Sequence, residues 1–205
     1  MKLNLLLGLT LSLSGMAKAQ LTVTMRVVND AKVPDWVLAK AEKDAEYILG
    51  QAGVELRWLR CPPRSVLDGP LNPCHQAFTP TEFWLRIVLQ KPPALGDETL
   101  GFAIHEPVEG TGGGYAYVSY PMVEVLTHSV RASASQVLGV AMAHEIGHLL
   151  LGVAHSPTGI MCARWRRPHF ELMSIGRLLF TPEQATQIRA VVMHRTGQAS
   201  AVMGR

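Results

Sequence analysis

The stretch "AHEIGHLLLGVAHSPTGIM", residues 143–161, decides how the rest of the sequence is interpreted. It contains His-Glu-x-x-His, then a glycine, a third histidine and a methionine. His144 and His148 are four residues apart, so both imidazoles leave the same face of a helix about one turn apart. That spacing lets two ring nitrogens reach one zinc ion at about 2.0–2.1 Å each. The stretch therefore predicts a zinc site.

The surrounding sequence indicates that this motif lies in a buried helix. Residues 133–152 are apolar nearly all round, with a capping box from Ser133 to Gln136 and a terminator at Gly152. Burying two imidazoles and a carboxylate without partners would cost several kcal/mol. A bound metal ion removes that cost, which favours a site over a coincidence of residues.

Glu145 is next to the first histidine and is rotated around the helix from it. There it can contact a water on the metal without binding the metal itself. Zinc lowers the pKa of such a water toward 7, and the carboxylate accepts its proton as general base. The activated water can then attack a carbonyl group that the zinc polarises.

A catalytic zinc ion usually has three protein ligands and an open position. His155 is the best candidate for the third, because Gly152 can end the helix with a left-handed residue and turn the chain back beneath the metal. Glu171, expected in a loop, remains an alternative ligand. The other histidines are either weaker candidates (His105 and His169) or simple surface residues (His75, His128 and His194).

Residues 144–161 resemble the metzincin clan of zinc proteases, whose signature is H-E-x-x-H-x-x-G-x-x-H followed by a methionine turn. The sequence HEIGHLLLG…HSPTGIM is also similar to that of small secreted bacterial metalloproteases. The resemblance implies a single α+β domain of zincin or metzincin type, with a twisted mixed sheet, a long active-site helix and a C-terminal helix. It also implies zinc-dependent hydrolysis of peptide or protein substrates. The matching positions are His144, Glu145, His148, Gly152, His155 and Met161, and Met161 would form a hydrophobic floor beneath the zinc.

The sequence departs from the clan at one point. Gly152 is four residues after His148, where the clan has three. One added helical residue rotates the exit by about 100° and advances it by about 1.5 Å. Either the last turn widens into a π-type bulge, or the following loop takes a different path to the same metal.

The remaining elements support one α+β domain with a mainly mixed sheet. Residues 21–28 alternate as a half-buried strand, with Val23 and Met25 on the core side and Arg26 on the opposite side. Further strands are expected at 54–61, 82–90, 100–106 and 112–120, and helices at 33–53 and from 181 onward.

Two segments are interpreted more simply. The triple glycine at 112–114 is expected to be a turn, and "YAYVSY" (115–120) resembles the clan edge strand that pairs with substrate. The basic run "CARWRRPH" (162–169) is interpreted as a solvated loop.

The first 19 residues have the features of a secretory signal peptide. Lys2 precedes a short apolar run, and Ala17-Lys18-Ala19 provides the small residues of a cleavage site. The apolar run is shorter than the roughly 20 residues of a spanning helix, so no stable membrane anchor is expected after its removal. The domain would then comprise residues 20–205 and would be secreted or periplasmic.

Charge and cysteine content agree with this assignment. The formal charge of +3 falls to +1 without Lys2 and Lys18, which argues against nucleic acid as the main partner. In an exported chain, Cys61 and Cys74 are expected to form a disulfide, and Cys162 is left as a buried free thiol.

Two alternatives to a peptidase remain open from sequence. One is an inactive, zinc-stabilised binding or structural protein, in which Cys162 or Glu171 fills the open metal position. The other is a zinc hydrolase of non-peptide amides or esters, since zinc and a glutamate do not themselves select the substrate.

Overall fold

The computed structural model describes residues 20–62, 72–90, 100–105 and 113–203. The expected signal peptide lies outside these residues, as does Gly112 of the turn expected at 112–114; Gly113 precedes β5 and Gly114 is its first residue. Eleven elements follow one another in this part of the chain. They are β1 (Thr22–Asn29), α1 (Asp35–Gln51), β2 (Glu55–Cys61), the 3-10 helix η2 (Pro73–His75), β3 (Glu82–Val88), β4 (Gly101–His105), β5 (Gly114–Ser119), α2 (Tyr120–Ser129), α3 (Ala134–Leu151), α4 (Arg167–Ser174) and α5 (Pro182–Met203).

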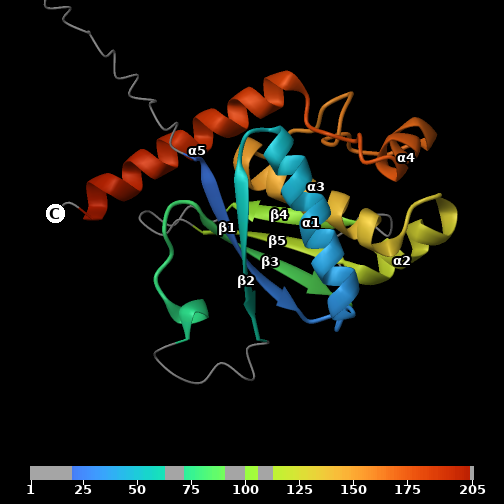
Figure 1. The fold of residues 1–205 in the computed structure, drawn as a ribbon, viewed down its shortest axis with the longest axis horizontal. Helices are drawn as coiled ribbons and strands as arrows, with labels where there is room; N and C mark the ends of the chain where they lie inside the picture. The colour runs from blue at the N-terminus through green and yellow to red at the C-terminus, as the bar shows by residue number, and fades with distance from the viewer. Residues whose placement is uncertain (1–19, 63–71, 91–99, 106–112, 204–205) are drawn as a thin grey trace, which may run out of the picture.

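The five strands form one mixed sheet in the order β2-β1-β3-β5-β4 (Figure 1). β1 pairs in parallel with β2 and β3, and β3 pairs in parallel with β5. β4 runs antiparallel to β5 and forms one edge of the sheet. The prediction of a single α+β domain with a mixed sheet is confirmed.

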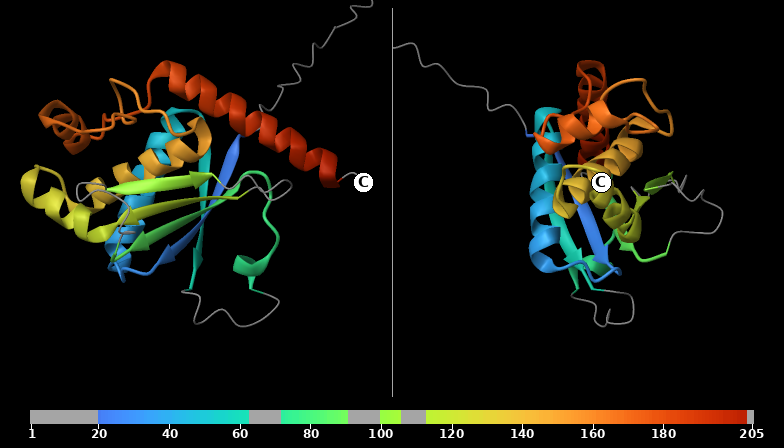
Figure 2. Two further views of the ribbon diagram at one scale, coloured as in Figure 1. Left: turned by 180° about the vertical axis from the view of Figure 1, so that it is seen from behind. Right: turned by 90° about the vertical axis from the view of Figure 1, so that its right-hand side faces the viewer.

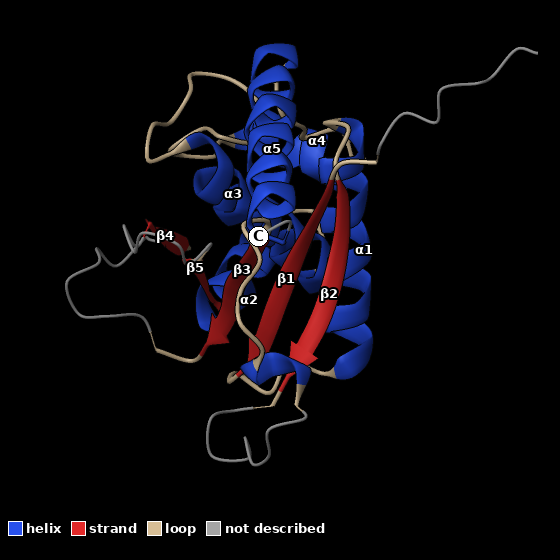
Figure 3. Ribbon diagram, turned by 90° about the vertical axis from the view of Figure 1, so that its left-hand side faces the viewer, coloured by secondary structure: helices blue, strands red, loops and turns tan. Residues whose placement is uncertain are grey.

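Helices α1 and α3 lie side by side on one face of the sheet (Figure 3). They approach each other closely at Gly139 of α3, where an added Cβ would lie 2.7 Å from the carbonyl oxygen of Ala41 in α1. α3 is buried along nearly all of its length, as its apolar sequence predicted. α5 lies across one end of the sheet and extends past it (Figure 2).

The opposite face of the sheet carries a second, smaller cluster. Cys61 and Cys74 form a disulfide, the pairing indicated by the sequence, and both pack against Val28 of β1. Arg26 is buried on this face, where it pairs with Glu82 at 2.8 Å and donates to the carbonyl oxygen of Gln76 at 2.8 Å. The predicted alternation holds at the start of β1, but the expectation that Arg26 lies on an open face was wrong, because the segment held by the disulfide covers that face.

Two further expectations are corrected, and one helix was not predicted. Residues 115–119 lie in β5, inside the sheet, so the edge strand is β4. Helix α2 was not predicted; it begins at Tyr120-Pro121, and the Pro in its first turn is the signal that indicates it. The basic run at 162–169 is only partly a loop, because α4 begins at Arg167 and contains Glu171.

None of the described helices is both long and apolar enough to cross a membrane.

Candidate metal centre

The first two histidines are fixed by the helix that carries them. α3 begins with the predicted capping box between Ser133 and Gln136 and continues without interruption to Leu151. His144 and His148 therefore project from the same buried face, and Glu145 is buried beside them. The length and apolar character of α3 hold these three polar groups inside the domain.

Three imidazoles converge at this point. The Nε2 atom of His148 lies 3.0 Å from Nε2 of His144 and 3.2 Å from Nε2 of His155. Two nitrogens bound tetrahedrally to zinc at 2.0–2.1 Å would be about 3.3 Å apart. The spacing of these atoms therefore fits a single metal ion with three histidine ligands. Among the described residues, these histidines form the group able to hold such an ion.

The other ring nitrogens of the two helical histidines face backbone carbonyls. Nδ1 of His144 lies 2.8 Å from the oxygen of Ile160, and Nδ1 of His148 lies 2.9 Å from the oxygen of Gly152. A carbonyl oxygen can only accept, so each Nδ1 must donate its proton. Each Nε2 then carries the lone pair that can bind a metal ion, which is the arrangement found in metal-binding histidines.

Burial sets the protonation of His144 and Glu145. The pKa of His144 is lowered to about 4, chiefly by burial, so the ring is neutral at pH 7, as a metal ligand must be. Burial raises the pKa of Glu145 to about 8. One oxygen of this carboxyl group, Oε2, is buried without a hydrogen-bond partner in the described part of the chain. Such a group is costly to leave unpaired, and a metal-associated water would satisfy it.

The extra residue before Gly152 is absorbed without a π-type bulge. The last turn of α3 is α-helical, and the amide of Gly152 donates to the carbonyl oxygen of His148 at 2.9 Å. Gly152 then takes φ 91° and ψ −172°. This conformation has a positive φ, as expected, but it is extended and not left-handed helical. The chain leaves α3 along a different path, and His155 still reaches the other two histidines.

The loop after His155 is pinned to the domain at several points. The amide of Ser156 donates to the carbonyl oxygen of Met161 at 2.9 Å, and that of Ile160 donates to Leu179 at 2.9 Å. Gly159 has φ +73°, and an added Cβ there would lie 2.9 Å from the oxygen of Leu179. These contacts hold the Ile160 carbonyl in place against His144.

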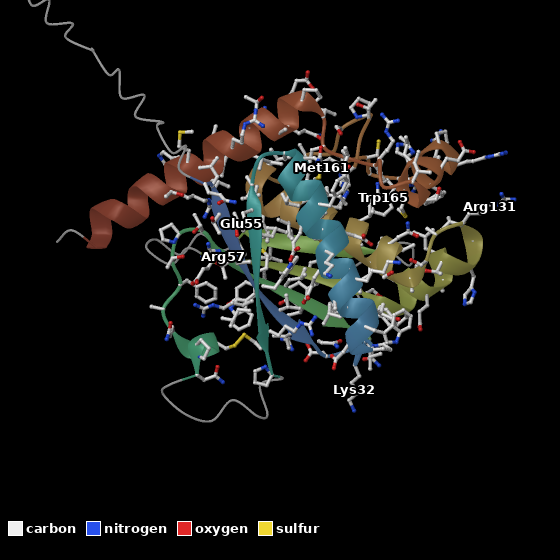
Figure 4. All side chains as sticks on the ribbon, in the orientation of Figure 1. Lys32, Glu55, Arg57, Arg131, Met161 and Trp165 are labelled. Atoms are coloured by element: carbon white, nitrogen blue, oxygen red, sulfur yellow. A yellow bond between two sulfur atoms is a disulfide. The ribbon has the colours of Figure 1, made fainter. Side chains whose placement is uncertain are left out.

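Met161 and Trp165 pack against α3 from this loop (Figure 4). Met161 is fully buried, and a Cβ added at Gly147 would lie 2.5 Å from its sulfur. Trp165 packs edge-on against the ring of His144, with centroids 5.5 Å apart, and donates its indole N–H to the carbonyl oxygen of Ile160 at 3.0 Å. Sequence patterns did not identify Trp165, because its contacts depend on the path of the loop.

The three histidines and Glu145 line an open cleft of about 830 Å³. Its walls come from the start of β4, from α2, and from the loop and helix around Trp165 and Phe170. α2 and α4 lie at the same end of the molecule (Figure 2). Gly101 of β4 approaches the motif closely, since an added Cβ would lie 2.6 Å from Oε1 of Glu145. Gly101 is a second site residue that sequence reasoning missed.

The weaker ligand candidates lie elsewhere. Glu171 is exposed on α4 and pairs with Arg167 at 3.0 Å. Cys162 lines the cleft, but its thiol contacts Nε2 of His169 at 3.2 Å, and neither residue belongs to the three-histidine group. His128 and His194 are exposed, as expected. His105 ends β4, and the side chains of His75 and His105 lie outside the described part of the structure.

Comparison with known proteins identifies solved structures of similar fold. No protein-family model and no curated protein matches the sequence. Among solved structures, the chain is similar to archaemetzincin from Methanopyrus kandleri, with a TM-score of 0.51 and 14% identity over 87% of this chain and 99% of that one. It is also similar to a zinc-dependent peptidase from Methanocorpusculum labreanum, with a TM-score of 0.52 and 17% identity over 80% of this chain and 99% of that one. At these identities the likeness establishes a common fold, and the chemistry must be argued from the site.

Proposed function

We propose that the protein is a secreted or periplasmic zinc-dependent metallopeptidase of metzincin type, with residues 20–205 as its single domain. The observation that carries this proposal is the convergence of three Nε2 atoms beside a buried carboxyl group at the floor of an open cleft. The fold shared with an archaemetzincin and a zinc-dependent peptidase supports it. Location outside the cytoplasm rests on the N-terminal sequence alone.

In the proposed site, His144, His148 and His155 hold Zn²⁺. When bound, the ion supplies a Lewis acid that polarises a carbonyl group and acidifies a water molecule. Glu145 accepts the proton of the attacking water and later donates it to the nitrogen of the leaving group. The Ile160 and Gly152 carbonyls fix the rings of His144 and His148 throughout.

A peptide is the substrate class that the cleft favours. β4 is an edge strand, and its first residues line the cleft next to Glu145. An extended peptide can add to such an edge through backbone hydrogen bonds, which a simple ester or small amide cannot do. An inactive structural zinc site is less well supported, because neither Cys162 nor Glu171 joins the three histidines.

The test compares wild type with Glu145→Gln on unfolded protein substrates after loading with zinc. We expect cleavage that a chelator abolishes and that Glu145→Gln reduces at least about 100-fold, while both proteins bind one zinc ion. Glu46→Gln, an exposed change on α1, is the matched control and should cleave as wild type does. Absence of chelator-sensitive cleavage above the Glu145→Gln level would remove the peptidase proposal for those substrates. Failure of zinc to co-purify would remove the zinc site as well.

A further inference from the structure

The cleft contains one permanent cation that the proposed chemistry does not use. Arg164 lines the cleft together with the three histidines and Glu145, and no other arginine or lysine does so among the described residues. Arg167, three residues later, is neutralised by Glu171 at 3.0 Å. Arg164 makes no hydrogen bond or ion pair with any residue in the described part of the chain.

Side chains on both sides of Arg164 hold this segment in place. Two residues before it, the thiol of Cys162 contacts Nε2 of His169 at 3.2 Å. The next residue, Trp165, donates its indole N–H to the carbonyl oxygen of Ile160 at 3.0 Å. A guanidinium group carried by a segment held at both ends needs less ordering when a ligand binds than one on a free loop.

Much of the rest of the cleft wall consists of apolar side chains that are open to solvent. Val125 of α2 is 58% exposed and Val153 is 78% exposed, and both line the cleft. Met122, Leu126 and Phe170 extend this apolar lining. Glu145 is the single carboxyl group of the described lining and is only 3% exposed, so it does not shield Arg164 from a ligand.

We propose that Arg164 is a carboxylate-binding residue of this cleft, selecting peptides that carry a carboxylate next to apolar side chains. A guanidinium group presents paired N–H donors that match the two oxygens of a carboxylate. The carboxylate can come from the free C-terminus of a peptide or from an Asp or Glu side chain, since both present the same group. This inference adds a substrate class to the proposed peptidase. Its role in substrate selection rests on the proposed function, whereas carboxylate binding by Arg164 does not.

The test measures binding to metal-free protein at pH 8, so that neither turnover nor a zinc–carboxylate bond contributes. This pH is well above the ordinary histidine pKa of about 6.5, which limits attraction to protonated imidazoles. Three probes are titrated by calorimetry: N-acetyl-Ala-Leu-Leu amide, the same peptide as its free acid, and N-acetyl-Glu-Leu-Leu amide. The free acid tests a terminal carboxylate and the glutamyl peptide tests a side-chain carboxylate.

For wild type we expect at least one carboxylate peptide to bind about tenfold or more tightly than the neutral amide, the range of a charged hydrogen bond. Arg164→Gln should reduce this preference to less than about twofold, and Arg164→Lys should keep part of it because the charge remains but the paired geometry is lost. Arg177→Gln removes an equal charge at an exposed position that does not line the cleft, and should retain the preference.

Equal affinities of all three peptides for wild type, or a preference that survives in Arg164→Gln, would overturn the inference. Unmeasurable binding of both carboxylate peptides would also overturn it. Failure of the peptidase proposal is seen separately, as zinc-loaded protein that binds the carboxylate peptide but cleaves no substrate. If zinc-loaded protein cleaves its substrate but Arg164→Gln has no effect on binding, the peptidase proposal stands and the inference about Arg164 fails.

Discussion

The carbonyl oxygen of Gly152 lies 2.9 Å from Nδ1 of His148, so the residue that ends α3 also orients one of its histidines. Gly152 can do this because it takes φ 91° with ψ −172°, a combination that is essentially restricted to glycine. The helix terminus and the metal centre therefore depend on the same backbone conformation.

Replacing Gly152 with alanine should weaken both the end of α3 and the metal centre. Apart from its chain neighbours, no described residue has an atom within 4 Å of an added Cβ, so the cost comes from the backbone conformation and not from a clash. We expect the free energy of unfolding of metal-free protein to fall by about 1–3 kcal/mol. If the Gly152 carbonyl moves away from His148, zinc affinity should fall about 10- to 100-fold.

Gly50→Ala is the matched control for this change. Gly50 lies in α1 without a positive φ, and an added Cβ would again meet nothing within 4 Å. Alanine there should stabilise the protein by about 0.5–1 kcal/mol. Urea unfolding and competitive zinc titration of both variants provide the measurements. Equal stability of Gly152→Ala and wild type would contradict the role given to Gly152.

His155→Ala should remove the third metal ligand and leave the domain folded, because His155 is exposed at its position after α3. We expect zinc affinity to fall by more than about 100-fold, beyond the loss typical of an outer hydrogen-bond partner. His194→Ala, an exposed change on α5, should bind zinc as wild type does. Competition against a chromophoric chelator measures both. Wild-type affinity in His155→Ala would assign the third position to another residue.

The helical residues of this centre could be predicted from the sequence more fully than His155 in the loop that follows. His144, Glu145 and His148 were predictable because one helix fixes their spacing. His155 was predictable as a candidate, but its approach was not, since a helix can accommodate an extra residue either by a π-type bulge or at its exit. The observed exit depends on Gly152 together with the hydrogen bonds that hold the 156–162 loop. Those partners, such as Leu179, are distant in sequence.

Gly101→Ala should impair catalysis while leaving zinc bound. An added Cβ would lie 2.6 Å from both Oε1 of Glu145 and the carbonyl oxygen of Tyr117, so the carboxyl group or β4 has to shift. We expect the cleavage rate to fall at least about tenfold, because small displacements of a catalytic group are costly. Gly113→Ala, which meets nothing within 4 Å, is the control. A fully active Gly101→Ala would show that Glu145 does not need this close packing.

The stability of metal-free protein should depend on pH in a way that identifies Glu145. Burial raises its pKa from 4.5 to about 8, so above pH 4.5 the folded state holds a proton that the unfolded state has lost. Stability therefore falls as pH rises toward 8, by at most about 1.4 kcal/mol per pH unit. His144 has the opposite effect between about pH 4 and 6.5, because its pKa is lowered from 6.5 to about 4.

The two effects oppose each other below pH 6.5, so the clear loss of stability is expected between pH 6.5 and 8. Glu145→Gln should remove this loss, while Glu46→Gln should retain it. Chemical unfolding of chelator-treated protein at intervals of half a pH unit measures the slope. A Glu145→Gln variant with the wild-type slope would contradict the assignment of the buried proton to Glu145.

Sequence patterns also located most strands and helices, and the errors have one physical source. Alternation along β1 placed Arg26 away from the core, but a disulfide-held segment covers that face and provides carbonyl partners for it. Likewise β5 has a regular strand pattern, yet nothing in its own residues determines that β4 takes the edge. Periodicity reports local conformation, whereas coverage and strand order depend on contacts between distant segments.

The disulfide itself should stabilise the domain without affecting the metal centre. Cys61 and Cys74 are 13 residues apart and lie in the small cluster with Val28, remote from Trp165, which lines the cleft (Figure 4). Closing a loop of this length contributes about 3 kcal/mol in the loop-entropy model. We expect the double change Cys61→Ala with Cys74→Ala to lower the free energy of unfolding by about this amount at unchanged zinc affinity. Cys162→Ala should leave the disulfide and most of the stability intact. If the double variant loses more zinc affinity than Cys162→Ala does, the covered face of β1 is coupled through the sheet to α3.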